Sequence, residues 1–154
     1  MNYNFEIYND FGNSLEKIWD EFEKNSINHC FQNFYWLKSW YLNLDNNENI
    51  KIINILVNKG EDLELILPMC IEQHKGIKYL KWQGEERADY MSGLFCNNFK
   101  MNKDEFFYLW EMIKEEIGLF DIIHLKKQPR YIDNVSNPFV EFLNSEKDFF
   151  SSSI

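Results

Sequence analysis

Asp89 and Tyr90 are the residues in this sequence whose types best suit ligand binding. They follow an apolar, strand-like run from Leu80 to Trp82 and a turn at Gly84, and loops that leave a strand often carry binding groups because the strand ends hold them rigid. The carboxylate of Asp89 can accept a hydrogen bond from an amine or a hydroxyl, and Tyr90 offers a flat ring and a phenolic O–H. The alternative interpretation is that Asp89 caps its own loop while Tyr90 packs in the core.

The same loop contains a second group of ionisable residues, Glu85 and Glu86 followed by Arg87. Paired carboxylates perform general acid–base chemistry when their surroundings push their pKa values apart. A charged, solvated surface loop is the commoner reason for such a cluster. The sequence therefore identifies no catalytic residue in this loop.

Histidine and cysteine residues give little indication of nucleophilic or metal chemistry. His29 stands beside Cys30, but adjacent side chains usually point apart, and the sequence offers no third group to orient them. His74 falls in a predicted turn, and His124 alternates with apolar residues, so that it either faces a cleft or is a structural histidine. No pair of histidines has the spacing of metal ligands, and we expect no bound metal.

The segment from Gln73 to Lys78 looks like the beginning of a Q-x-x-G-x-G/A loop, the type that holds the pyrophosphate of coenzyme A. Such a loop works because backbone N–H groups at the start of a helix face the phosphates. Here the residues after Gly76 have the pattern of a strand, and Lys78 replaces the last glycine. We therefore interpret this segment as a hairpin turn and expect no cofactor-binding residues in it.

Composition limits the class of protein. The chain has 154 residues, of which 45% are hydrophobic and 18% aromatic, enough for one packed domain. Its formal net charge of -9 argues against binding to nucleic acid or to an anionic membrane, since both require a basic surface. No apolar run approaches the roughly 20 residues of a membrane-spanning helix. The widely spaced cysteines and the absence of a signal-peptide pattern predict a cytoplasmic protein with free thiols.

Residue periodicity predicts an α+β domain with the order β-α-α-β-β-β-α-β, in which helices flank a mixed, mostly antiparallel sheet. Pro68 lacks an N–H, so it marks an edge strand, a bulge or the end of regular pairing. The last strand–helix–strand part would be a crossover unit if its two strands lie side by side. The expected strands are 5–8, 50–57, 63–71, 77–82 and 121–126, and the expected helices are 15–24, 34–44 and 103–117.

The predicted domain covers residues 1–130. Residues 131–154 are expected to be a tail, or the start of a linker to a missing second domain. Apolar residues from Phe139 to Phe150 show no secure period, and we interpret them as an exposed surface that forms an interface.

Several short motifs occur in a characteristic order. They are a Gln followed by a Trp-x-x-x-Trp helix, a strand ending in Leu-Pro, and a glycine followed by Asp-Tyr. Together they resemble the N-terminal half of the CelD-like acyltransferases of the GNAT superfamily, relatives of the Fem-type aminoacyltransferases, over residues 5–129. In this sequence the motifs are Phe31-Gln32 with Trp36 and Trp40, Leu67-Pro68, the turn at Gly76, Gly84 with Asp89-Tyr90, and the strand from Asp121 to Leu125.

The resemblance implies a GNAT-like fold and transfer of an acyl group from an acyl-CoA to an amine or hydroxyl, with this chain as the acceptor-side domain. It implies that Gln32, Trp36, Asp89 and Tyr90 line the groove for the acceptor, a small molecule or a polysaccharide of the cell envelope. Acetyl-CoA or another acyl-CoA is the implied cofactor of the full-length protein. We expect a second GNAT domain, in cis or in trans, to bind it rather than this chain alone.

The alternative hypothesis is a non-catalytic GNAT-like binding or interaction module, or a truncated half that needs a partner domain. Under this hypothesis the chain performs no chemistry of its own. An acyltransferase activity is expected only where a second GNAT domain completes the protein.

Overall fold

The sheet is built around β3 (Ile50–Lys59) and β4 (Asp62–His74) in this computed structural model, which describes residues 2–45 and 47–144. Both strands are rich in branched apolar residues, which favour pleated structure, and β3 is buried without interruption from Ile52 to Val57. Continuous burial of this kind requires cover on both faces of the sheet. A turn containing Gly60, whose φ is 63°, joins the two strands.

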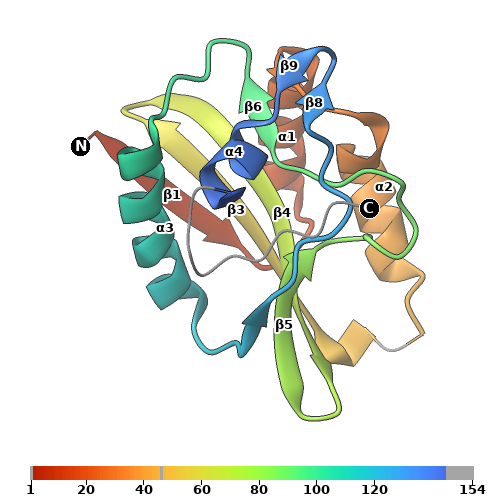
Figure 1. The fold of residues 1–154 in the computed structure, drawn as a ribbon. Coiled ribbons are helices and arrows are strands. Elements are labelled where there is room, and N and C mark those ends of the chain that lie inside the picture. Colours follow the sequence, from red (N-terminus) through yellow and green to blue (C-terminus); the bar gives the residue numbers. More distant parts are fainter. Residues whose placement is uncertain (1, 46, 145–154) are drawn as a thin grey trace.

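The main path of the sheet runs in the order β1-β3-β4-β5-β7, as Figure 1 shows. β1 (Tyr3–Tyr8) pairs antiparallel with β3, and β5 (Ile77–Trp82) pairs antiparallel with β4. β7 (Ile122–Ile123) pairs parallel with β5. The predicted crossover unit is therefore confirmed, because β5 and β7 lie side by side and a helix connects them.

Four short strands complete the sheet structure. β2 (Ser26–Ile27) pairs with β6 (Leu94–Cys96), which also pairs with β4. β8 (Tyr131–Ile132) and β9 (Val135–Ser136) form a separate two-stranded ribbon. These strands have two or three residues each, too few to produce a readable alternation in the sequence.

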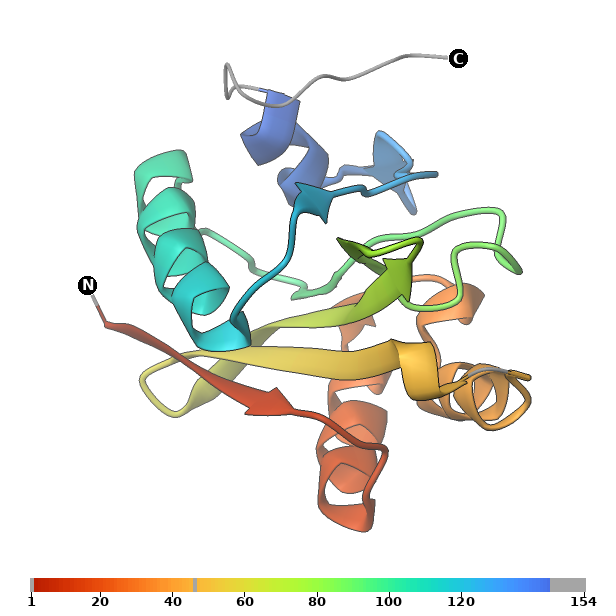
Figure 2. The ribbon, with the colours of Figure 1, turned by 90° about the horizontal axis from the view of Figure 1, so that it is seen from below.

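Helices cover both faces of the sheet. α1 (Asn13–Lys24) and α2 (Phe34–Leu42) lie on one face, and α3 (Lys103–Ile117) and α4 (Pro138–Asn144) lie on the other (Figure 2). Two short 3-10 helices, η1 and η2, span Cys30–Gln32 and Asn47–Asn49. None of the helices in the described ranges is long and apolar enough to cross a membrane.

Alternate residues of β3 serve two separate cores. Ile52 and Leu56 pack with α1 and α2, whereas Ile53, Ile55 and Val57 belong to the larger core under α3 and α4. The strand can do this because successive side chains of a strand point to opposite faces. The α+β class and the mostly antiparallel sheet flanked by helices are thus confirmed, while the GNAT-specific assignment stays a prediction.

Pro68 occupies the position in β4 where its missing N–H costs no ladder hydrogen bond. Pairing with β5 ends at Met69, and pairing with β6 begins at Ile66, so Pro68 lies between the two partners. Its carbonyl still accepts a hydrogen bond from the N–H of Gln83 at 3.0 Å. Regular pairing thus ends at Pro68 on the β5 side of the strand, while pairing with β3 continues through Asn54 and Pro68.

The turn between β4 and β5 can be compared directly with its prediction, and α3 begins at a capping residue. Lys75 and Gly76 have φ values of 50° and 83° and connect β4 to β5, so the hairpin interpretation of the segment around them is confirmed. Asn102 caps α3 by accepting a hydrogen bond from the N–H of Glu105, whose carboxylate accepts from the N–H of Asn102, both at 3.0 Å.

The C-terminal part of the described chain packs onto the domain. The ring of Phe139 lies 5.4 Å from that of Trp82, and the ring of Phe142 stacks on Phe106 at 4.7 Å. Phe139, Phe142 and Leu143 are buried, so this stretch is not the exposed apolar surface that the sequence suggested. Residues 145–154, the remainder of the predicted tail, lie outside the described residues, and the domain boundary after residue 130 stays a prediction.

Candidate functional site

The candidate site is the loop of residues 83–93, which follows β5 at the carboxyl end of the parallel pair β5 and β7. Sheets with parallel strands commonly bind ligands beyond the carboxyl ends of those strands. β5 and β7 are paired only through Tyr79 with Ile122 and Leu80 with Ile123. Beyond these two pairs the two segments no longer pair as strands, and the segment after β5 contains Asp89 and Tyr90.

Lys127 attaches the loop to the segment that follows β7. Its Nζ donates to the backbone carbonyls of Glu85 and Ala88, each at 2.7 Å, and its carbonyl accepts from the N–H of Met91 at 2.9 Å. The φ of Lys127 is 56°, which is uncommon for a residue other than glycine. The loop after β5 is therefore tied to the chain that follows β7.

Trp36 and Gly84 make the closest packing contact at the start of the loop. A Cβ atom on residue 84 would lie 2.5 Å from Cζ3 and 2.7 Å from Cη2 of Trp36, and the φ of Gly84 is 74°. Glycine satisfies both the space and the backbone conformation. Trp36, one of the predicted site residues, thus covers the loop from α2, with its ring edge-on to Phe31 at 5.5 Å.

Two buried amides fix the beginning of the loop to the sheet. Nε2 of Gln83 donates to Oδ1 of Asn54 and to the carbonyl of Met69, each at 2.7 Å. Nδ2 of Asn54 in turn donates to the carbonyl of Asp10 at 3.1 Å. Neither amide was identified from the sequence, although Asn54 interrupts an otherwise apolar strand and is a signal of a buried polar contact.

A charged cluster lies between β5 and α2. Nζ of Lys81 lies 2.5 Å from Oε2 of Glu72, 3.5 Å from Oε1 of Glu85 and 3.7 Å from Oε2 of Glu86. Burial lowers the pKa of Lys81, but the hydrogen bond to Glu72 and the charge of Glu85 outweigh burial, so the pKa is raised. Trp40 Nε1 also donates to Oε1 of Glu86 at 2.6 Å. Lys81 is therefore a charged, ion-paired residue and is unsuited to act as a base.

Gln32 holds the far end of the loop. It is fully buried, and Nε2 donates to the carbonyl of Ser92 and, at 2.7 Å, to that of Gly93. Its Oε1 accepts from the N–H of His29 at 2.9 Å. Both hydrogens of the amide are used within the protein, so an acceptor molecule could bind this amide only by displacing a loop carbonyl.

Tyr90 lies at the surface and belongs to an aromatic cluster that we define as His29, Phe31, Trp36 and Tyr90. The Tyr90 side chain is 56% exposed, and its ring centroid lies 6.3 Å from that of His29. The ring of His29 lies 6.0 Å from that of Phe31. Tyr90 therefore does not pack in the core, and Asp89, which precedes it, is also exposed.

The imidazole of His29 is uncharged at neutral pH. Burial lowers its pKa to about 4, although the charge of Asp133 opposes this effect. Asp133 belongs to the turn between β8 and β9, so the aromatic cluster also neighbours the ribbon. No local sequence pattern predicts this environment for His29, because its neighbours come from distant segments.

The structure places two of the four predicted residues, Asp89 and Tyr90, exposed on the loop. Trp36 covers the start of the loop at Gly84, and Gln32 supports its far end from inside. A carboxylate, a phenol and aromatic faces suit the binding of a molecule with hydroxyl or amine groups.

Nucleophilic and metal chemistry find little support in the described ranges. Cys30 is exposed, Cys96 is half-buried and Cys70 is buried, and all three are free thiols. Burial raises the pKa of the Cys70 thiol, so it stays protonated. Within residues 2–45 and 47–144, no group of three or more His, Cys, Asp or Glu side chains could hold a metal ion.

Comparison with known proteins identifies no relative. No family model matches the chain, and no curated protein or solved structure matches it significantly. The protein is therefore characterised by its own features, an α+β domain with helices on both faces of its sheet and an aromatic cluster beside a rigid loop.

Replacing Gln32 with leucine should lower the free energy of unfolding by about 2–4 kcal/mol, because two buried loop carbonyls lose their donor. Thermal and urea unfolding measure the change, and Gln73→Leu, at an exposed position, is the matched control. An unchanged stability of Gln32→Leu would contradict the supporting role and favour a direct contact with a ligand.

Gly84→Ala should destabilise the protein by about 3 kcal/mol, because its Cβ meets the Trp36 indole and its φ is positive. Gly76→Ala is the control for backbone strain alone, since its φ of 83° is similar but nothing lies within 4 Å of the added Cβ; it should cost about 1 kcal/mol. Combining Gly84→Ala with Trp36→Leu should recover part of the loss. Equal costs for the two alanine variants would exclude the steric contact.

His29 should make the stability depend on pH between about 6.5 and 4. The pKa is lower in the folded state than its ordinary value of 6.5, so the unfolded chain binds the proton more tightly. The contribution of His29 is fully present above pH 6.5 and is lost as the pH falls toward 4. His29→Phe should flatten the unfolding free energy across this range relative to His74→Phe, which alters an exposed histidine.

Proposed function

We propose that this chain is the acceptor-side domain of a CelD-like acyltransferase of the GNAT superfamily. The observation that carries the proposal is the order of its main elements: β1, the helices α1 and α2, the antiparallel strands β3, β4 and β5, the helix α3, and β7, which pairs parallel with β5. This order matches the succession that the sequence motifs imply. The placement of Trp36, Asp89 and Tyr90 around one loop supports the same assignment.

The proposed reaction transfers an acyl group from an acyl-CoA thioester to an amine or hydroxyl. The acceptor nitrogen or oxygen attacks the thioester carbonyl, the C–S bond breaks, coenzyme A leaves as a thiolate, and a base takes the acceptor proton. In this scheme the carboxylate of Asp89 accepts a hydrogen bond from the acceptor and Tyr90 packs against it. These are binding roles, and the base is assigned to no residue.

A second GNAT domain, in cis or in trans, is proposed to bind the acyl-CoA. This division is supported by the loop after β5, because hydrogen bonds of Lys127 with Glu85, Ala88 and Met91 tie the chain beyond β5 to the chain beyond β7. Donors that stabilise the oxyanion of the transition state would then come from that second domain. The acceptor would be a small molecule or a cell-envelope polysaccharide.

The second candidate is a GNAT-like module that binds or pairs without catalysis. The same attached loop favours it, because a loop whose backbone carbonyls are held by Lys127 can serve as a recognition surface without a reaction. The two candidates differ in whether an acyl acceptor binds at Asp89 and Tyr90.

Ligand-induced changes in melting temperature test the proposal, because a ligand that binds the folded state stabilises it. Glucosamine and its oligomers are suitable probes, since they carry both amine and hydroxyl groups. We expect them to raise the melting temperature of the chain, and acetyl-CoA alone to leave it unchanged. Asp89→Asn and Tyr90→Phe should abolish the shift, whereas Asp62→Asn and Tyr108→Phe, exposed residues at other positions, should retain it.

Two results would contradict the proposal in different ways. A rise in melting temperature with acetyl-CoA alone would show that this chain binds the donor itself. No response to any acceptor, with unaltered folding of the variants, would favour the non-catalytic module.

A further inference from the structure

β1 has an open edge. Among the described strands it pairs only with β3, and its register with β3 is regular from Tyr3 to Tyr8. The carbonyl of Asn2 accepts from the N–H of Gly60 at 3.0 Å, so every second residue from Asn2 directs its backbone groups toward β3. Tyr3, Phe5 and Ile7 therefore direct their backbone N–H and C=O groups outward, away from β3. Natural edge strands are usually blunted by proline, bulges or cover, and unpaired ones accept an added strand.

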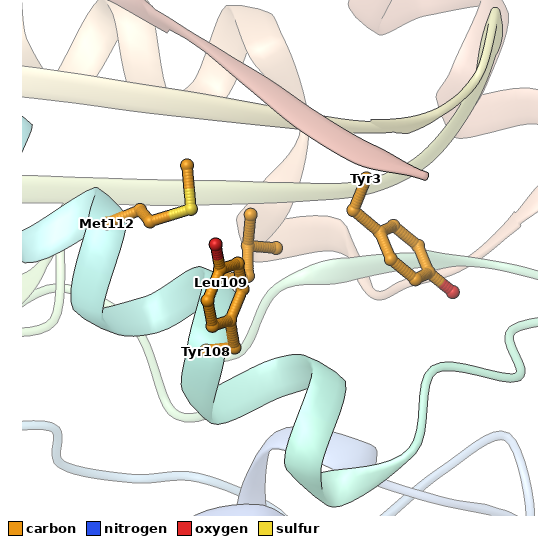
Figure 3. Close-up of a pocket in the computed structure, with 4 residues that line it drawn as sticks. All are labelled: Tyr3, Tyr108, Leu109 and Met112. Carbon is orange, nitrogen blue, oxygen red and sulfur yellow. The ribbon is translucent and has the colours of Figure 1, made fainter. Parts of the chain in front are cut away.

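A hollow lies between this edge and α3. It has a volume of about 460 Å³ and is lined by Tyr3 from β1 and by Tyr108, Leu109 and Met112 from α3, as Figure 3 shows. Tyr108 and Met112 are 58% and 41% exposed, although both are large and mostly apolar. A volume of this size accommodates a large apolar side chain together with its neighbours.

A second, smaller hollow lies between the end of β1, β3 and the C-terminal end of α3. It has a volume of about 110 Å³, and it is lined by Ile7, Asn9, Lys51, Ile53, Glu116 and Ile117. Tyr3 and Ile7 are four residues apart on β1, about 13 Å along a strand. A strand added to β1 would place every second side chain on the α3 face, so residues four apart would lie beside Tyr3 and Ile7, each of which lines one hollow.

The charge of the surrounding surface selects among possible occupants. Acidic residues outnumber basic ones on α3, and Glu6 adds a further carboxylate on β1. A second copy of the chain, with its net charge of -9, would bring like charges together, whereas a basic segment would be attracted. The charged residues of α3 are Lys103, Asp104, Glu105, Glu111, Lys114, Glu115 and Glu116.

We propose that the edge of β1 and the adjoining face of α3 form a docking groove for an extended segment of a partner protein. The segment adds to β1 as a new strand, inserts a large apolar side chain between Tyr3 and Met112, and carries lysine or arginine residues that face the acidic surface. Main-chain hydrogen bonds to Tyr3, Phe5 and Ile7 supply affinity, and the two hollows supply specificity. This groove is distinct from the loop that contains Asp89 and Tyr90, and the inference does not depend on acyl transfer.

The probe for the experiment is a synthetic peptide, acetyl-Lys-Thr-Leu-Thr-Phe-Thr-Leu-Lys-amide, titrated into the full chain by calorimetry. Two matched peptides are controls: one has glutamate at both ends, and the other has alternate backbone amides N-methylated. We expect the parent peptide to bind and both controls to bind at least about tenfold more weakly, through lost charge attraction or lost backbone pairing.

Protein variants locate the binding. Met112→Gln keeps the helix propensity and removes the apolar contact, and it should weaken binding about tenfold. Leu119→Gln changes a residue that is 87% exposed outside the groove and should leave binding unchanged. Amide hydrogen exchange should slow at Phe5 and Ile7 when the peptide is bound, and stay constant at Asn4 and Glu6, whose N–H groups face β3.

Three outcomes would overturn the proposal. The first is that the peptide does not bind at concentrations up to about 1 mM. Its affinity would then be weaker than recognised strand-addition sites require. The second is equal binding of the parent and the N-methylated peptides. The third is a dimer in sedimentation that Met112→Gln dissociates, since the groove would then hold a second copy of the chain.

Discussion

The buried amide of Gln32 is the interaction on which the arrangement of the site depends. It joins η1 to the carbonyls of Ser92 and Gly93, and the carbonyl of Gln32 accepts from Nε1 of Trp19 at 3.0 Å. One residue thus ties α1, the segment before α2 and the end of the loop together. The contact with the carbonyl of Gly93 also requires glycine at position 93. A Cβ atom there would lie 2.8 Å from Cδ2 of Leu67. An apolar residue at position 32 would leave both carbonyls buried without a donor.

Most of the fold could be predicted from periodicity because its main elements are long. The apolar runs of β3 and β4 and the helical spacing in α3 each extend over many residues, and Pro68 lies in β4 at the change of partner. The short strands β2 and β6 and the ribbon were not predicted, since two or three residues carry no period. Helix α4 is stabilised by contacts of Phe139 and Phe142 with Trp82 and Phe106, which lie far away in the sequence.

The candidate site was predicted less completely, and the reason is physical. Asp89, Tyr90 and Trp36 could be selected because their types are informative without knowledge of their neighbours. Residues that hold the loop, such as Lys127 and Gln83, act on backbone or amide groups 14 to 42 positions away. No local pattern marks such pairs. Gln32 was selected for binding, whereas its contacts show a supporting function that only the folded arrangement reveals.

The attachment of the loop by Lys127 has a consequence for synthesis of the chain. During translation, β5 and the loop emerge well before Lys127, which follows Glu85 by 42 positions. Until α3 has formed and β7 has paired with β5, the carbonyls of Glu85 and Ala88 lack their donor and Met91 lacks its acceptor. Contacts between distant positions form late because closing a long segment costs entropy. The loop that displays Asp89 and Tyr90 therefore acquires its shape near the end of folding, after most of the sheet beneath it.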